Sequence, residues 1–226
     1  MIQLPFRDRV EAGQLLAAEL VKHKLRDAVV LALPRGGVPV GFEVAKTLHA
    51  PLDVVVVRKI GVPWQPELAM GAIAGASFDL LDWDLIAKLG ISRQEIDAAI
   101  RSERAEVQRR ENLYRDGRPA PDLRSRTVVL VDDGLATGST MLVAVRYARS
   151  FKPAKVVVAV PVGSQEACMR LEQQVDDLVC LAAPASFRAV GEWYLDFRQT
   201  SDAEVRLLLE QSRRIETAAE LTSHRR

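Results

Sequence analysis

The chain has 226 residues, of which 48% are hydrophobic and 27% are charged, so it is long enough to bury one large core. Its 31 lysine and arginine residues balance 30 aspartate and glutamate residues, which argues against a nucleic-acid-binding protein held by a global positive field. Two cysteines and three histidines argue against a disulfide framework or a zinc site, and without an apolar run of membrane-spanning or signal-peptide character we expect a cytoplasmic protein.

Short apolar runs alternate with amphipathic segments through most of the chain. The runs AVVLALP, LDVVVV, TVVLV, AKVVVAV and DLVCLAA have the composition of strands that are buried on both faces. The expected strands cover residues 28–34, 52–57, 127–131, 154–160 and 177–183, and the expected helices cover residues 9–22, 38–49, 139–151, 164–175 and 202–215. Strands separated by helices predict an α/β fold with a doubly wound, mainly parallel sheet and helices on both faces.

The segment over about 82–121 departs from this alternation. One or two short strands over 70–81 precede it, and Ser92 with Glu95 three residues later forms a capping-box signature. Behind this signature, EIDAAIRSERAEVQRRENLYR predicts a long, highly charged helix with few apolar positions. We expect a helical insert that serves as a lid or as a dimer arm, and we favour the dimer contact.

Two adjacent aspartates, Asp132 and Asp133, follow the run TVVLV directly. They therefore lie at the carboxyl edge of the predicted sheet, where ligands bind in open α/β folds. Carboxylates beside a buried strand need a compensating partner, and the vicinal hydroxyls of a ribose are suitable hydrogen-bond donors. The alternative is an aspartate pair that caps the following helix.

The loop after the aspartates has the composition of an anion-binding loop. Its backbone N–H groups and the N-terminus of the following helix can hold a phosphate, and three hydroxyl groups add donors. The stretch lacks the GK[ST] ending of a P-loop, and it suits a ligand that carries a ribose diol and a 5′-phosphate. The residues expected to hold the ribose and the phosphate are Asp132, Asp133, Ala136, Thr137, Gly138, Ser139 and Thr140.

The stretch VVLVDDGLATGST (128–140) resembles the phosphoribosyl pyrophosphate (PRPP) signature of the type I phosphoribosyltransferases. LPRGGVPVG (33–41) is similar to the pyrophosphate loop of that family, in which a non-proline cis peptide is frequent. VVVVRKIG (54–61) resembles the second core strand, which ends in basic residues that reach PRPP. The resemblance implies one phosphoribosyltransferase-like domain over 1–226, with the helical insert and a C-terminal hood over about 184–200.

This resemblance also implies an activity and the residues that perform it. The family transfers the 5-phosphoribosyl group of PRPP to a nitrogenous acceptor, usually a nucleobase, and releases pyrophosphate, with Mg²⁺ bound mainly through PRPP. The pyrophosphate would meet Arg35, Gly36, Gly37, Arg58 and Lys59, and catalysis would involve Lys59, Asp132, Asp133 and Glu67. Glu67 is the candidate for proton transfer, and the alternative is an unpaired glutamate on the surface.

Two further positions bear on the acceptor. Ala136 stands where 6-oxopurine members of the family commonly have an aspartate, which argues against a hypoxanthine- or guanine-type acceptor. Phe187, Trp193 and Tyr194 are concentrated in a chain that is only 5% aromatic, and they are the expected acceptor pocket. The alternative is a small core that covers the edge of the sheet.

The expected partners are PRPP, a nucleobase and a second copy of the chain, with no membrane. A second hypothesis is a PRPP- or nucleotide-sensing regulator with little turnover, whose insert arginines could contact nucleic acid. Glutamates interleave with those arginines, so a self-paired, solvated helix is the better interpretation. A third hypothesis is a phosphoribosyl hydrolase or a transferase with another kind of acceptor.

Overall fold

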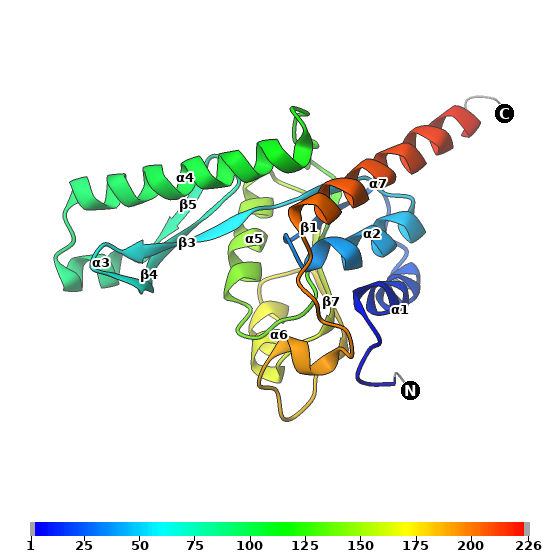
Figure 1. Ribbon diagram of the computed structural model, residues 1–226, viewed down its shortest axis with the longest axis horizontal. Helices are drawn as coiled ribbons and strands as arrows, with labels where there is room; N and C mark the ends of the chain where they lie inside the picture. The colour runs from blue at the N-terminus through cyan, green and yellow to red at the C-terminus, as the bar shows by residue number, and fades with distance from the viewer. Residues whose placement is uncertain (1–2, 224–226) are drawn as a thin grey trace.

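The computed structural model describes residues 3–223, and its centre is a five-stranded, all-parallel sheet with the strand order β2-β1-β6-β7-β8 (Figure 1). The strands are β1 (Ala28–Ala32), β2 (Leu52–Val54), β6 (Thr127–Val131), β7 (Lys155–Val162) and β8 (Asp177–Ala182). Every residue of β1, β2 and β6 is buried, which explains their apolar composition, and the charged residue among them, Asp53 of β2, is paired with Arg115.

Helices cover both faces of this sheet, as the alternation of elements predicts. Alternate residues of β1 belong to two different cores, since Val30 and Ala32 pack on one side and Val29 and Leu31 on the other. The first side is covered by α1 (Arg9–Val21), α2 (Gly37–Leu48) and α7 (Asp202–Ser223), and the second by α5 (Ser139–Ser150) and α6 (Gln165–Glu172). The doubly wound fold class is confirmed, and α7 continues beyond the expected end at residue 215.

A second, antiparallel sheet projects away from the first. It contains β3 (Val57–Val62), β4 (Gln65–Ala74) and β5 (Phe78–Leu81) in that order. The helices α3 (Trp83–Leu89) and α4 (Arg93–Arg115) follow, and α4 lies along this sheet as it extends from the body of the molecule (Figure 1). We call residues 57–115 the arm.

The apolar run LDVVVV divides between the two sheets. Its first half is β2, and its last residue, Val57, begins β3, so Arg58 and Lys59 lie inside a strand rather than after one. Residues 57–74 form a β3–β4 hairpin with a short turn. Val55 and Val56 remain buried through the division, so hydropathy alone contained no sign of the change in pairing partner.

Helix α4 uses its few apolar residues efficiently. Ile96, Ile100, Val107 and Tyr114 recur at helical spacing and are buried against β3, β4 and α7. The capping box is present, because the Ser92 side chain accepts from the Glu95 N–H and the Glu95 carboxylate accepts from the Ser92 N–H. The helix therefore packs on its own chain along one side and exposes its charged side to solvent.

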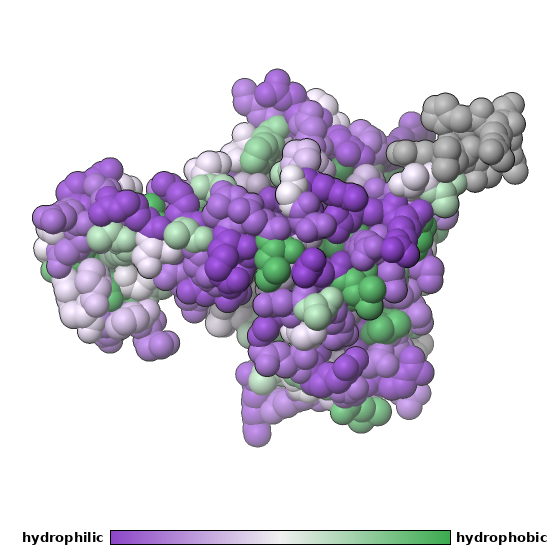
Figure 2. Space-filling view, turned by 45° about the horizontal axis from the view of Figure 1, so that its top comes forward, coloured by the Kyte–Doolittle hydropathy of each residue, from purple (hydrophilic) through white to green (hydrophobic). Residues whose placement is uncertain are grey.

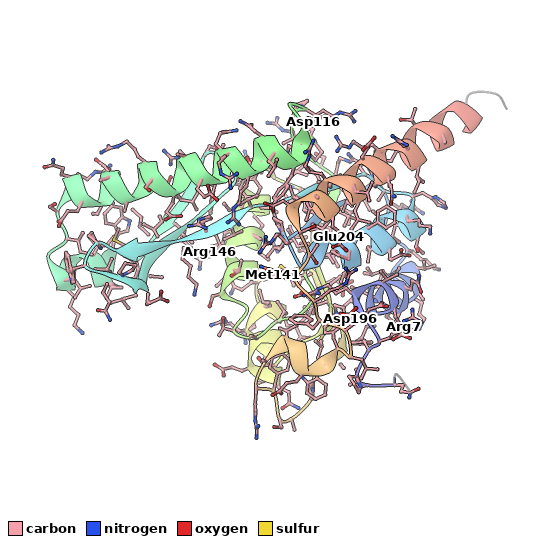
Figure 3. All side chains as sticks on the ribbon, viewed as in Figure 1. Arg7, Asp116, Met141, Arg146, Asp196 and Glu204 are labelled. Atoms are coloured by element: carbon pink, nitrogen blue, oxygen red, sulfur yellow. The ribbon has the colours of Figure 1, made fainter. Side chains whose placement is uncertain are left out.

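The N-terminal segment and the hood come together over the edge of the sheet. Phe6 pairs with Tyr194 in an isolated parallel bridge, and the Phe6 N–H donates to the Trp193 carbonyl over 2.8 Å. The short 3₁₀ helix η1 (Val190–Trp193) lies in this hood, and Asp196 lies beside Arg7 (Figure 3). None of the helices within residues 3–223 combines the length and the hydropathy that a membrane span requires.

The strand order places the site. The chain runs from β1 outward to β2 and later returns to β6 on the other side of β1, so β1 and β6 flank the point at which the strand order reverses. Ala32 is in register with Val131, and the Leu33 N–H donates to the Val131 carbonyl over 2.9 Å. The segments that follow β1 and β6 therefore meet where open α/β sheets bind their ligands.

Candidate active site

Two glycines allow the segments after β1 and β6 to touch. A Cβ atom on Gly36 would overlap the carboxylate of Asp133, and one on Gly37 would lie 2.7 Å from the Val131 carbonyl oxygen and 2.9 Å from the Cα of Asp132. The backbone of Gly36 has an ordinary helical φ of −62°, so the absence of a side chain serves close approach and not an unusual conformation. The predicted pyrophosphate loop and the predicted ribose-binding aspartates thus form one site.

The two aspartates lie in a poorly solvated position. The Asp133 N–H donates to Oδ1 of Asp132 over 2.9 Å, which fixes the first carboxylate. Burial and the neighbouring Asp133 raise the pKa of Asp132 well above its ordinary value. Burial also raises the pKa of Asp133, although Arg9 acts in the opposite direction. Such a pair is expected where a bound partner, here one that donates hydrogen bonds, completes the site.

Arg9 is a member of the site that the sequence did not indicate. Its Nε donates to Oδ2 of Asp133 over 2.8 Å, and the two side chains are only 11% and 14% exposed. The guanidinium also lies 3.9 Å from the ring centroid of Phe197 and donates to the Arg198 carbonyl. Because 124 residues separate Arg9 from Asp133, no local spacing pattern could have revealed this pair.

The loop between the aspartates and α5 is open to solvent and held from behind. Ala136, Thr137, Ser139 and Thr140 are exposed. Two carbonyl groups of the loop accept hydrogen bonds from the α6 region, since Ser164 Oγ donates to the Ala136 carbonyl over 2.7 Å and Arg170 donates to the Thr137 carbonyl. These two carbonyl groups are hydrogen-bonded within the protein, and Gly138 has a φ of 68° directly before the first turn of α5. The loop therefore has the arrangement of an anion cradle.

Arg35 lies in the predicted pyrophosphate loop, and the Pro34–Arg35 peptide is cis, as the family resemblance implies. Its Nη1 lies 3.9 Å from Oδ1 of Asp202, the first residue of α7. The same oxygen accepts a hydrogen bond from the Tyr114 hydroxyl over 2.6 Å. Burial and the bond to Asp202 raise the pKa of Tyr114 to about 12. Asp202 and Tyr114 therefore connect the arm to the pyrophosphate loop, and no local pattern in the sequence indicates this connection.

The structure separates the two basic residues of β3. Arg58 donates to Glu103 of α4 over 2.6 Å, so its charge is neutralised within the arm. The side chain of Lys59 has no hydrogen bond or ion pair with another described residue, and it lines a cavity of about 650 Å³ together with Ser139 and Thr140. Lys59 is thus near the phosphate end of the predicted site.

Glu67 and the aromatic residues of the hood differ from Lys59 in their position relative to Asp132 and Asp133. Glu67 is exposed at the start of β4, in the arm and away from the β6–α5 loop (Figure 1). Tyr194 is only 5% exposed, packs between Phe6 and Phe197, and donates its hydroxyl to the Asp133 carbonyl over 2.6 Å.

Tyr194 therefore belongs to the small core that the sequence offered as the alternative. Phe187 and Trp193 stack on each other with centroids 6.2 Å apart, and both keep part of their surface exposed. The indole Nε1 of Trp193 is buried without a hydrogen-bond partner among the described residues. Of the three aromatics, Phe187 and Trp193 are the ones with surface available to an acceptor.

Comparison with known proteins agrees with this geometry. The model of the phosphoribosyl transferase domain family matches residues 8–197, and the chain belongs to that family. Its fold is that of the type I phosphoribosyltransferases.

Two proteins of Mycobacterium tuberculosis, from strains CDC 1551 and H37Rv and provisionally named as phosphoribosyl transferases, are each 48% identical to this chain over 209 residues. The match covers 92% of this chain and 47% of theirs, so the chain spans about half the length of these relatives. The crystal structure of TT1426 from Thermus thermophilus is 42% identical, has a TM-score of 0.80, and is matched over 91% of this chain and 98% of its own.

Proposed function

We propose that the protein transfers the 5-phosphoribosyl group of PRPP to a nitrogen of a nucleobase-like acceptor and releases pyrophosphate. The observation that carries this proposal is the contact between the two glycines after β1 and the two aspartates after β6 at the switch point of the sheet. Anion-binding backbone on one side and hydroxyl-binding carboxylates on the other match the chemistry of PRPP. Membership of the phosphoribosyl transferase family supports the same class of reaction.

In this reaction the bond from C1 of the ribose to the pyrophosphate oxygen breaks, and a bond from C1 to the acceptor nitrogen forms. The acceptor gives up a proton, for which Glu67 is the proposed base. Asp132 and Asp133 would hold the ribose hydroxyls, and the loop over 134–138 with Ser139 and Thr140 would hold the 5′-phosphate. Arg35 and Lys59, with the backbone of Gly36 and Gly37, would bind the pyrophosphate as charge develops on it.

Mg²⁺ fits this site through PRPP rather than through a cage of side chains. Within residues 3–223, no three histidine, cysteine, aspartate or glutamate side chains gather closely enough to hold a metal ion. Asp132 and Asp133 nevertheless offer the hard oxygen atoms that Mg²⁺ accepts alongside phosphate oxygens. Bound in this way, the ion would neutralise charge on the leaving pyrophosphate.

We also propose a cytoplasmic homodimer. Cys168 and Cys180 are both free thiols, which agrees with a reducing compartment. The projecting arm and its exposed tryptophans, Trp64 and Trp83, supply a surface for a second copy of the chain.

The test is pyrophosphate release from Mg·PRPP with a panel of purine and pyrimidine bases and a control without acceptor. Release that depends on one base would establish the transferase and identify its acceptor. Release without any base would instead indicate a hydrolase, and PRPP binding without release would indicate the regulator. The variant Asp132→Asn with Asp133→Asn is expected to lose PRPP binding, and full retention of binding would refute the ribose assignment.

Glu67→Gln tests the proposed base separately. If Glu67 accepts the acceptor proton, the substitution lowers kcat by about 10²-fold or more and changes the dissociation constant of PRPP by less than about 3-fold. Glu166→Gln, which replaces an exposed carboxylate on α6, is the control and is expected to leave kcat near that of the wild type. An equal loss of kcat and PRPP affinity in Glu67→Gln would contradict the assignment.

A further inference from the structure

A second cationic site lies outside the residues assigned to PRPP, where the end of α4 meets α7. A cavity of about 340 Å³ there is lined by Tyr114, Asp116, Arg118, Ala203, Arg206, Leu207, Glu210 and Arg213. A smaller cavity of about 150 Å³ shares Tyr114, Arg118 and Arg213 with it, so the two are adjacent. We call the two adjacent cavities the α4–α7 groove, and we propose that it binds an oligophosphate anion.

The arginines of the groove are positioned without carboxylate partners. Among the described residues, none of Arg118, Arg206 and Arg213 has a carboxylate oxygen within 4.0 Å. Arg213 is fixed by backbone instead, because its Nε donates to the Leu209 carbonyl over 2.9 Å and its Nη1 donates to the Arg115 carbonyl over 3.4 Å. Guanidinium N–H groups that remain free are then available to a ligand.

The acidic residues around the groove leave it cationic. Asp53, in the smaller cavity, and the neighbouring Glu111 both pair with Arg115, over 2.8 and 3.2 Å, and Glu210 is paired with Arg214, which does not line the groove. Asp116 is the remaining lining carboxylate, and it lies in a left-handed conformation at the end of α4 (Figure 3). The face formed by α4 and α7, which Figure 2 turns toward the reader, is mostly hydrophilic.

The ligand class follows from this donor set. Several guanidinium groups around one small cavity match a ligand with adjacent phosphate groups, because each guanidinium can bond two phosphate oxygens in its own plane. A single carboxylate ligand would satisfy only one arginine. The volume is at the low end of ordinary ligand pockets and suits a di- or triphosphate group. Such a group could be inorganic or part of a nucleotide.

The groove is also connected to the pyrophosphate loop. Tyr114 lines both cavities and donates to Asp202, whose same oxygen lies 3.9 Å from Nη1 of Arg35. An anion that accepts a hydrogen bond from the Tyr114 hydroxyl would compete with Asp202 for it. The interaction of Asp202 with Arg35 would then change. The groove would therefore be an effector site for the reaction, a consequence that rests on the proposed function.

Isothermal titration with inorganic triphosphate tests the site. Triphosphate is expected to bind both at the predicted PRPP site and in the groove. In the double variant Arg118→Ala with Arg206→Ala, its affinity for the groove is expected to fall at least 10-fold, while PRPP binding persists. The control, Arg101→Ala, removes an exposed arginine of α4 that does not line the groove and is expected to retain both binding events. Triphosphate binding that is identical in the wild type, the double variant and the control would overturn the proposal.

Two further measurements identify the part of the ligand that binds and test whether the groove affects the reaction. Affinity for a nucleoside triphosphate equal to that for inorganic triphosphate assigns the site to the phosphates alone, and tighter nucleotide binding adds a nucleoside contact. Tyr114→Phe is expected to retain triphosphate binding but to abolish its effect on the KM for PRPP. If turnover proves absent while the double variant still loses a binding event, the proposed function fails and the groove stands; the reverse result overturns the groove alone.

Discussion

Asp133 is the residue through which the separate parts of the site are connected. Its carboxylate contacts Arg9 at the start of α1 and the backbone of Gly36, while its carbonyl accepts from Tyr194 in the hood. Three segments that are distant in the sequence thus depend on one side chain and its backbone. Changes at Asp133 and at its neighbours should affect both stability and PRPP binding. For Asp132→Asn, stability should rise while PRPP binding weakens.

Asp132→Asn should stabilise the free protein and weaken PRPP binding. Because folding raises the pKa of Asp132 above 3.8, the cost of its charge is fully present above the raised pKa and disappears as the pH falls below that ordinary value. The variant should therefore melt roughly 2–4 °C higher at pH 7, about 1 kcal/mol, and show little difference near pH 4. Thermal melts at both pH values, with and without Mg·PRPP, make the comparison, and a lower melting temperature at pH 7 would contradict it.

Arg9→Ala should destabilise the protein because it leaves the Asp133 carboxylate poorly solvated and without its ion-pair partner. A loss of about 3 kcal/mol, or roughly 6–12 °C in Tm, is expected at neutral pH. Adding Asp133→Asn to Arg9→Ala should recover much of this loss, since no unpaired charge remains. Chemical denaturation of the two single variants and the double variant measures the coupling, and simple additivity would show that the ion pair is energetically unimportant.

At the scale of elements, the two segments that follow β1 and β6 fit together only because one of them lacks side chains. Gly36→Ala places a methyl group against the Asp133 carboxylate although its backbone conformation suits alanine. We expect PRPP affinity to fall at least 10-fold and Tm to fall by several degrees. In the double variant Gly36→Ala with Asp133→Ala the methyl group has room, so the loss of stability should be smaller than the sum of the losses in the two single variants, while PRPP binding stays weak.

The sequence predicted the elements that have a local signature. TVVLV followed by DDGLATGST indicated a strand, a loop and a helix, and all three are present as β6, the loop and α5. LDVVVV was predicted as one strand, because an apolar run does not show where its hydrogen-bonding partner changes. Arg9 and Asp202 escaped prediction for another reason, since their contacts with Asp133 and Arg35 are long-range and have no periodicity.

At the scale of the whole molecule, the arm is an extension whose end exposes large apolar side chains. Trp64 and Trp83 are 58% and 55% exposed, and Trp83 lines the 650 Å³ cavity between the arm and α5. Figure 3 shows Arg146 and Met141 on α5, and Arg146 lines the same cavity. Exposed tryptophans on a projecting arm are the kind of surface expected of a contact between copies, whereas the cavity beside them is lined by Lys59, Ser139 and Thr140 of the predicted PRPP site.

If the arm is a dimer contact, Trp64→Glu with Trp83→Glu should convert a dimer into a monomer. Light scattering coupled to gel filtration measures the mass. Met169→Glu, which changes an equally exposed apolar residue on α6, should leave the dimer intact. A monomeric wild type, or a dimer that survives the double substitution, would assign the arm to another role.

The distribution of the site along the chain has a consequence for biosynthesis. A nascent chain whose β7 has just emerged from the ribosome already contains Arg9, Gly36 and Gly37, and the whole stretch 128–140. It still lacks Tyr194, which supports the Asp133 carbonyl, and Asp202, which lies beside Arg35. PRPP capture should therefore begin only after the start of α7 has left the ribosome, so prematurely terminated products would be unable to sequester the substrate.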